Sequence, residues 1–253
     1  VRVVALLFAM VMLTNCASAP ANDQEAVREL KKINDPLEPT NRWIFNFNQS
    51  VDSGVIKPIT GLYRGILPSF VRDSVHNFLD NIKTPVVFAN DVLQGEPTRA
   101  GTTLLRFLIN STAGIAGVRD QATDWGFEDH DEDFGQTLGA WGIEPGPYLI
   151  LPILGPTSTR DLGGKVGDWL VDPVGLYLIR EDYEDFLLAT KVTKALDTRV
   201  ELDGVIEGTR ENSLDPYAIM RTMYLQRRAR LIANEESEET SIYDIDIDVM
   251  LLE

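Results

Sequence analysis

The segment from Gly135 to Pro156 constrains the fold of this chain more than any other part of it. Its sequence, GQTLGAWGIEPGPYLILPILGP, is rich in glycine, interrupted by proline and strongly apolar, and Glu144 is its one charged residue. Connections on a protein surface are normally polar, and a buried connection leaves backbone amides that need partners. We therefore expect this segment to meet something other than bulk water.

The first residues of the sequence are typical of an exported protein. A short apolar run from Val3 to Leu13 follows Arg2 and is too short to span a bilayer, which needs about 20 apolar residues. It leads to Cys16, the one cysteine in the sequence, which cannot form an internal disulfide. Residues 13–16 (LTNC) resemble the bacterial lipobox, so we predict a signal peptide over residues 1–15, lipidation at Cys16 and a linker over residues 16–34. The alternative for Cys16 is a buried free thiol.

The last residues of the sequence are acidic. Residues 235–253 contain eight acidic residues and no basic one, a composition that predicts a solvated, disordered tail. The whole chain carries a formal net charge of −16. Such a chain repels both nucleic acid and anionic lipid headgroups, so nucleic acid is excluded as a partner, and membrane attachment must have another cause.

Between these ends, residues 35–234 are predicted to form one helical domain. The pairs Asp35-Pro36, Asp172-Pro173 and Asp215-Pro216 each offer a capping side chain followed by a residue that suits the first helical turn. Apolar residues recur at helical spacing along two segments, and Thr84-Pro85 is predicted to open a third helix that ends near Gln94-Gly95. We expect these stripes to be ordinary core: Leu37, Ile44, Phe47 and Val51 on the first helix, and Val71, Val75, Phe78 and Ile82 on the second.

One segment lacks the amphipathic pattern. Residues 104–118 are apolar most of the way round, with Arg106 as the sole charge, which indicates either a central buried helix or a helix that touches lipid. Residues 183–206 and 216–233 are predicted as charged amphipathic helices that face water. Arg227, Arg228 and Arg230 are expected to lie at a helix C-terminus, where cations are favourable.

The chemistry of an enzyme is not apparent in the sequence. It contains no nucleophile elbow, no phosphate-binding loop, no zinc-protease motif and no paired cysteines. His76 is expected at the boundary of its helix. His130 lies in the acidic run Glu128–Asp133, which we interpret as a solvated turn rather than as a cation site. We therefore predict no enzyme activity, no cofactor and no metal.

Several motifs are spread along the body of the chain. They begin at residues 35–42 (DPLEPTNR) and 45–48 (FNFN) and are densest at residues 133–139 (DFGQTLG) and 146–149 (GPYL). Together these motifs resemble the MlaA (VacJ) family of outer-membrane lipoproteins. The resemblance covers the body from Asp35 to about Asn234. The family motif of the first helix is carried by Asp35, Pro36, Leu37, Asn41, Arg42, Asn46, Phe47 and Asn48.

The resemblance implies an all-α, single-domain ring of helices that lies in the periplasmic leaflet of the outer membrane and surrounds a central amphipathic channel. It implies removal of mislocalised phospholipid from the outer leaflet and its delivery to a soluble periplasmic carrier, beside a trimeric porin. The channel and its loop are expected to involve Phe134, Gly135, Gly139, Gly142, Gly146, Tyr148, Leu149 and Pro152.

The residues themselves are compatible with a lipid conduit. Removing a two-chain phospholipid exposes some thirty methylenes and costs roughly 25 kcal/mol, so a shielded path is required. Glycine at positions 142 and 146 is expected to supply positive φ angles at the lip of that path. Two alternatives stay open: a lipid-anchored periplasmic scaffold without a channel, and a phospholipase that uses one of the two histidines.

Overall fold

The computed structural model describes residues 34–235. The predicted signal peptide, Cys16 and the tail beyond residue 235 lie outside the described residues. Within them the chain is mostly helical, as predicted. One short antiparallel hairpin, in which β1 (Tyr148–Leu151) pairs with β2 (Gly155–Ser158), was not expected from the sequence.

The first half of the described chain contains the longest helix. This half comprises, in chain order, α3 (Glu38–Val51), the π-helix η1 (Asp52–Ile56), α4 (Lys57–Ile66), the long α5 (Ser69–Gln94), α6 (Pro97–Thr112), α7 (Gln121–Asp124) and α8 (Phe134–Ala140). After the hairpin follow α9 (Thr159–Val171), α10 (Pro173–Arg180), α11 (Glu184–Glu201), α12 (Asp203–Asn212) and α13 (Pro216–Ile232).

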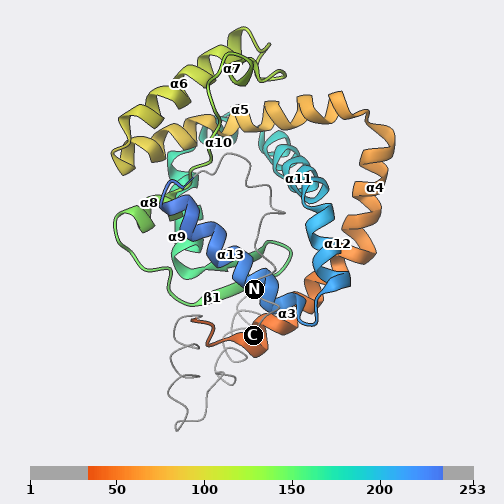
Figure 1. Ribbon diagram of the computed structural model, residues 1–253. Helices are drawn as coiled ribbons and strands as arrows, with labels where there is room; N and C mark the ends of the chain where they lie inside the picture. Colours follow the sequence, from red (N-terminus) through yellow and green to blue (C-terminus); the bar gives the residue numbers. More distant parts are fainter. Residues whose placement is uncertain (1–33, 236–253) are drawn as a thin grey trace.

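These elements follow one another around a frame. Figure 1 shows α5 along one side, α4 along the next, α3 and the hairpin along the third, and α8 and α9 along the fourth. Within this outline α11 extends from α5 and is followed by α12 beside α4, while α13 runs across towards α8. Because α6 packs on α5 and α7 packs on α6, that side has an additional layer.

The prediction that Thr84-Pro85 opens a new helix is wrong. A single helix, α5, runs from Ser69 to Gln94 with Pro85 inside it. A proline in a helix removes one backbone hydrogen bond and clashes with the preceding turn, but packing on neighbouring elements can outweigh that cost. Here α5 packs along α6 and also contacts α8, α9, α10 and α11. The predicted end is confirmed, because Gly95 caps the helix in the left-handed conformation at φ 79°.

The role predicted for Asp35 is also wrong. The first helix begins at Glu38, with Leu37 as its N-cap and no side-chain cap. Asp35 is buried instead, and its carboxylate accepts hydrogen bonds from Asn41, Tyr217 and Arg221. Because these tertiary hydrogen bonds occupy the carboxylate, it does not cap the helix.

The other two Asp-Pro pairs are confirmed as helix starts. The Asp172 carboxylate accepts from the backbone N–H groups of Val174 and Gly175, and Asp215 accepts from that of Ala218. In both cases proline occupies the start of the first helical turn. These caps depend only on local geometry, which the sequence determines.

The helix predicted over residues 183–206 is interrupted. It divides at Leu202 into α11 and α12, and α11 exposes Phe186, Leu188 and Val192 rather than an entirely polar face. Arg228, predicted as a helix-terminal charge, is instead largely buried and donates two hydrogen bonds to Asp133, at 2.6 and 3.0 Å. This pair fastens α13 to the start of α8.

The packing of side chains is inverted relative to an ordinary globular domain. Among residues 34–235, buried polar and charged residues outnumber buried hydrophobic ones, and large hydrophobic side chains are exposed on most helices. The main hydrophobic cluster contains Ile44, Phe45, Tyr148, Ile150 and Tyr217, at the junction of α3, β1 and α13. No helix of the described part is both long and apolar enough to cross a bilayer.

The predicted core stripes are correct only in part. Ile44 is buried, but Phe47 is 42% exposed and stacks on Trp43, which is exposed as well. On α5, Phe78 is partly exposed while its neighbour Leu79 is buried. Helical spacing identified the apolar residues of these helices but not the side that faces inward, because in this fold apolar residues also face outward.

Candidate functional site

A polar cavity of about 410 Å³ lies between α5, α6 and α11. Charged residues from all three helices line it, and the segment 120–131 and Arg227 of α13 contribute further polar groups. The principal lining residues are His76, Asp80, Lys83, Arg106, Asp129 and Lys194. A second cavity of about 310 Å³ shares His76, Asn77 and Glu201 with the first, so the two adjoin.

The α6 wall shows how the sequence produces this cavity. Thr103, Arg106 and Asn110 recur at helical spacing, are buried and line the cavity. The apolar residues of the same helix, Leu104, Leu105 and Leu108, are exposed. Of the two interpretations offered for residues 104–118, a helix with an exposed apolar side agrees with the structure and a buried central helix does not. Within the segment 104–118, α6 ends at Thr112 and a series of turns follows.

Arg106 organises one side of the cavity. Its guanidinium pairs with Asp120 at 3.0 Å and Asp129 at 3.1 Å and also donates to Thr123 and the Phe127 carbonyl. Burial raises the pKa of Asp129, and the attraction of Arg106 only partly opposes this effect. Burial would also raise the pKa of Asp120, but hydrogen bonds from Thr123, Asn110 and Arg106 more than offset it and lower that pKa.

His76 organises the opposite side. Its Nε2 lies 2.8 Å from Asp80, and its Nδ1 lies 2.7 Å from Asp197 and 2.9 Å from Glu201. The hydrogen bond with Asp80 raises the pKa of His76 to about 9, although burial opposes the shift. The sequence analysis placed His76 at a boundary, and it is indeed half-buried, but its three carboxylate partners were not foreseen.

The interpretation of residues 128–133 as a solvated turn is correct for Glu128, Asp129 and Asp131, which are exposed, but wrong for His130 and Glu132. His130 and Glu132 are buried: His130 Nε2 lies 3.0 Å from Asp91, and Glu132 accepts from Gln94 and Arg99. Burial raises the pKa of Glu132. His130 and Glu132 point inward because Asp91 and Gln94 on α5 and Arg99 on α6 supply their polar partners. These partners are far away in the sequence, so a local pattern does not reveal them.

The family-motif residues of α3 hold the hairpin. Asn41 donates to the Tyr148 carbonyl and accepts from the Ile150 N–H, and Asn48, two turns along, contacts Leu151 and Ile153 in the same way. Arg42 donates two hydrogen bonds to Asp215 and stacks on Tyr217. Asn46 and Phe47 are exposed, and Pro36 and Leu37 are partly exposed. None of these residues lines either cavity.

The glycine-rich segment is not one continuous loop. Phe134, Gly135 and Gly139 lie in α8, Tyr148 and Leu149 in β1, and Pro152 in the hairpin turn. Gly142 and Gly146 have φ angles of 85° and 68°, so the predicted positive φ is confirmed at both. Like the residues of the α3 motif, all these residues lie away from the two cavities.

At two of these positions a Cβ would crowd neighbouring side chains. A Cβ on Gly135 would lie 2.8 Å from an Asp161 oxygen and 2.9 Å from an Arg228 nitrogen. A Cβ on Gly146 would lie 2.1 Å from the Thr159 hydroxyl. Tyr148 is buried in the hydrophobic cluster, and burial raises the pKa of its hydroxyl above the ordinary range. These residues hold α8, α9 and the hairpin together.

Several cavity residues were not expected from the sequence to be site residues: Asp80, Lys83, Lys194, Asp197 and Glu201. His76 and His130 also line the cavity but were considered only as possible bases, and Arg106 stood out as the lone charge in an apolar segment. That signal could have been used more fully, since a buried arginine needs several carboxylate or carbonyl partners and therefore predicts a polar interior.

Comparison with known proteins agrees with this architecture. A family model described as MlaA lipoprotein matches residues 33–231. The intermembrane phospholipid transport system lipoprotein MlaA of Escherichia coli K12 is 30% identical over 240 residues, which cover 89% of this chain and 86% of the relative. The lipoprotein MlaA of Haemophilus influenzae is 32% identical and covers 87% of this chain, with 86% of its own length matched.

A solved structure also resembles this chain. It was reported as the structural basis for maintenance of bacterial outer membrane lipid asymmetry, and it superposes with a TM-score of 0.70 at 32% sequence identity. The match covers 78% of this chain and 98% of the solved one. Since both the sequence and the fold match over most of their length, the chain belongs to the MlaA lipoprotein family.

Proposed function

We propose that this protein is an outer-membrane lipoprotein of an intermembrane phospholipid transport system. It removes mislocalised phospholipid from the outer leaflet and passes it to a soluble periplasmic carrier, which maintains the lipid asymmetry of the outer membrane. The relatives named above support this assignment, as does the resemblance seen in the sequence motifs.

The observation that carries the proposal is the inverted arrangement of α5, α6 and α11. These helices direct charged groups towards a shared cavity and expose large apolar side chains elsewhere. A water-soluble scaffold would gain nothing from this arrangement, because exposed apolar surface is unfavourable in water. A body set among lipid tails that passes a charged headgroup requires both features.

The exposed apolar residues support a position within one leaflet. Every large part of the frame contributes: α3, η1 and α4 expose Trp43, Val55, Ile59, Leu62 and Ile66, and α9 to α11 expose Val166, Trp169, Leu170, Tyr177 and Leu188. Monomeric soluble proteins rarely expose apolar surface on this scale. We place the frame in the periplasmic leaflet of the outer membrane, anchored through the lipidated Cys16.

The proposed route is passive. Paired charges such as Arg106 with Asp129 and Lys194 with Asp80 line the cavity, and they suit a zwitterionic or anionic headgroup that must leave water. The family resemblance adds a trimeric porin as the neighbour in the membrane. The channel itself and the loop at residues 134–152 belong to the proposal on the same grounds.

A hydrolase is the rival function, and one cluster bears on it. Thr103 Oγ1 lies 3.1 Å from His130 Nε2, which suggests a nucleophile beside a base. However, both Asp91 oxygens meet that same ring nitrogen, at 3.0 and 3.1 Å. A catalytic triad requires the carboxylate at one ring nitrogen and the nucleophile at the other. Our proposal therefore includes no hydrolytic step.

A matched pair of variants of α11 tests the conduit. Thr198 lines the cavity, whereas Val192 on the same helix is exposed. In cells that lack the gene, Thr198→Trp should fail to restore low surface phospholipid, because the indole fills the cavity. Val192→Trp should restore it. Surface-phospholipid labelling and detergent sensitivity report the outcome, and folding of both variants is checked by thermal unfolding. Full rescue by a folded Thr198→Trp protein would refute transport through this cavity.

A further inference from the structure

We propose that His76, Asp197 and Glu201 form a binding site for one divalent transition-metal cation, with Zn²⁺ as the best match. The site lies in the wall shared by the two cavities and joins α5 to α11. This inference goes beyond lipid transport and does not depend on it.

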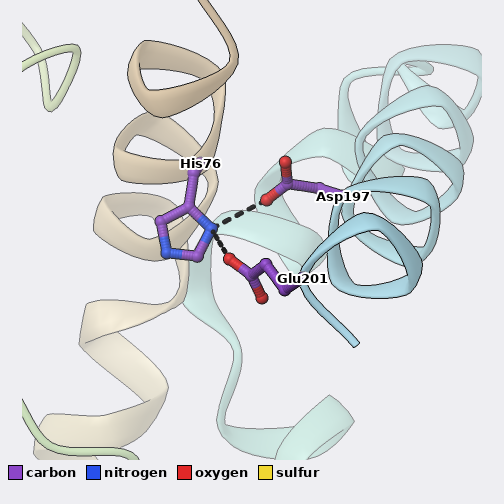
Figure 2. A group of neighbouring side chains, drawn as sticks. All are labelled: His76, Asp197 and Glu201. Atoms are coloured by element: carbon purple, nitrogen blue, oxygen red, sulfur yellow. Dashed lines mark hydrogen bonds and ion pairs between the residues drawn. The ribbon is translucent and has the colours of Figure 1, made fainter. Parts of the chain in front are cut away.

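The three donor atoms already converge. Figure 2 shows the His76 ring of α5 directed between two carboxylates of α11. Nδ1 lies 2.7 Å from Asp197 Oδ2 and 2.9 Å from Glu201 Oε1, and one ligand atom from each residue lies within 4.8 Å of the others. Tetrahedral Zn²⁺ with bonds of about 2.0–2.1 Å separates its ligand atoms by about 3.4 Å. Small side-chain rotations would therefore admit the cation.

The backbone holds the donors in a suitable frame. Asp197 and Glu201 are four residues apart on α11, so they project from the same face one turn apart. Asp197 is buried, whereas Glu201 is 48% exposed and can adjust its position. A fixed carboxylate beside a more mobile one provides both an anchor and the freedom to reach the bond length that the cation requires.

The outer partners of His76 match those of known metal ligands. A histidine that binds metal through one nitrogen usually donates its other N–H to a carboxylate, which fixes the ring. Asp80, one turn along α5 from His76, lies 2.8 Å from Nε2 and is itself held by Lys194 at 2.6 Å. This arrangement leaves Nδ1 for the cation.

The donor set selects the class of cation. Imidazole nitrogen together with two carboxylates suits Zn²⁺ and its neighbours, whereas Ca²⁺ and Mg²⁺ prefer all-oxygen sites with six or more ligands. Both cavities reach His76 and Glu201, so water can supply a fourth ligand. Without a cation, the same carboxylates hold His76 as an imidazolium, and binding must displace its Nδ1 proton.

The site would act as a clip between two helices. His76 belongs to α5 and the carboxylates to α11, so a bound cation would cross-link residues that are more than a hundred positions apart in the sequence. A cation that binds only the folded state raises the melting temperature with increasing concentration. Metal binding should therefore stabilise this wall of the cavity.

Calorimetric titration with ZnSO₄ tests the site on the full-length chain in detergent, without a histidine tag. The wild type should bind one high-affinity equivalent, and its melting temperature should rise by several degrees. Binding of Co²⁺ should give the intense visible absorption of a four-coordinate site. Replacing the half-exposed Glu201 by glutamine should weaken Zn²⁺ binding at least tenfold without harming the fold, and His76→Gln should abolish it.

Glu184→Gln provides the matched control, because it removes the same charge from an exposed position on the same helix. Its affinity should equal that of the wild type. The proposal is overturned if the wild type shows no stoichiometric site, or if folded His76→Gln and Glu201→Gln retain its affinity. Since metal binding is read directly, its failure would leave the lipid-transport assay unaffected.

Discussion

At the junction of α3, β1 and α13 a hydrophobic cluster packs beside the buried ion pair of Asp35 with Arg221, whereas between α5, α6 and α11 the interior is polar. Phe45, Tyr148 and Tyr217 meet edge to face in the first region, and their ring centroids lie 5.7 and 6.3 Å apart. In the second region Arg106 and His76 face carboxylates across a cavity. The first region resembles an ordinary protein core, and the second resembles the lining of a passage.

The difference shows that one chain can combine an apolar core in one region with a polar interior in another. Apolar packing is tolerant of swaps that conserve volume, whereas a buried charge that loses its partner is strongly destabilising. The hydrophobic cluster should therefore respond to changes of shape and the cavity wall to changes of charge. Four experiments test this contrast.

Removal of the Tyr217 ring should have the largest effect. Tyr217→Ala should lower the free energy of unfolding by about 3–5 kcal/mol, because it opens a cavity in the hydrophobic cluster. Tyr217→Phe should cost only about 1–2 kcal/mol, since Asp35 keeps its bonds to Asn41 and Arg221. Urea unfolding in detergent measures both. A loss below 1 kcal/mol for Tyr217→Ala would show that this cluster is not the core.

Removal of the Arg106 charge should have the next largest effect. Arg106→Met conserves much of the volume but leaves Asp120 and Asp129 without their cation, so unfolding should become easier by about 2–4 kcal/mol. A substitution that conserves volume in the hydrophobic cluster should change the free energy of unfolding much less. Arg106→Lys, measured in parallel, should recover part of the loss. If methionine is tolerated fully, the polar wall is not held by charge.

Acid should weaken charge-dependent contacts selectively. Burial would raise the pKa of Asp133, but the Arg228 guanidinium more than offsets it and holds that pKa well below its ordinary value of about 3.9. A lowered carboxyl pKa contributes stability above the unfolded pKa and loses it as the pH falls towards the folded pKa. The stability advantage of the wild type over Asp133→Asn, about 2 kcal/mol at pH 6, should therefore shrink below about pH 4.

Ile44→Val provides the matched comparison, because it removes one methylene from the hydrophobic cluster and no charge. Its cost of about 1 kcal/mol should be the same at pH 6 and at pH 3. A cost that falls with pH in both variants would indicate global acid unfolding rather than loss of one ion pair.

Changes on the outer face should have the smallest effect on folding. The double variant Leu105→Ser, Leu108→Ser alters two exposed side chains of α6, so unfolding in detergent should change by less than about 0.5 kcal/mol. Binding to phospholipid vesicles, measured by flotation, should fall clearly. Unchanged flotation would mean that this face does not contact lipid.

Much of the local structure could be predicted from the sequence. The caps at Asp172 and Asp215, the end of α5 at Gly95 and the positive φ of Gly142 and Gly146 were all foreseen. Each depends on a few neighbouring residues whose conformational preferences are strong. The motifs at residues 35–48 and 133–149 also identified the family, because their order and spacing persist along the chain.

The tertiary structure alone decided which side of each helix faces inward. Apolar periodicity normally marks the buried face, but the solvent around this protein is inferred to be partly lipid, so the rule failed for Phe47 and α6. The same holds for Asp35, His130 and Arg228, which looked like capping or solvated groups. Their partners lie far away in the sequence, and a long-range ion pair leaves no local pattern from which it could be inferred.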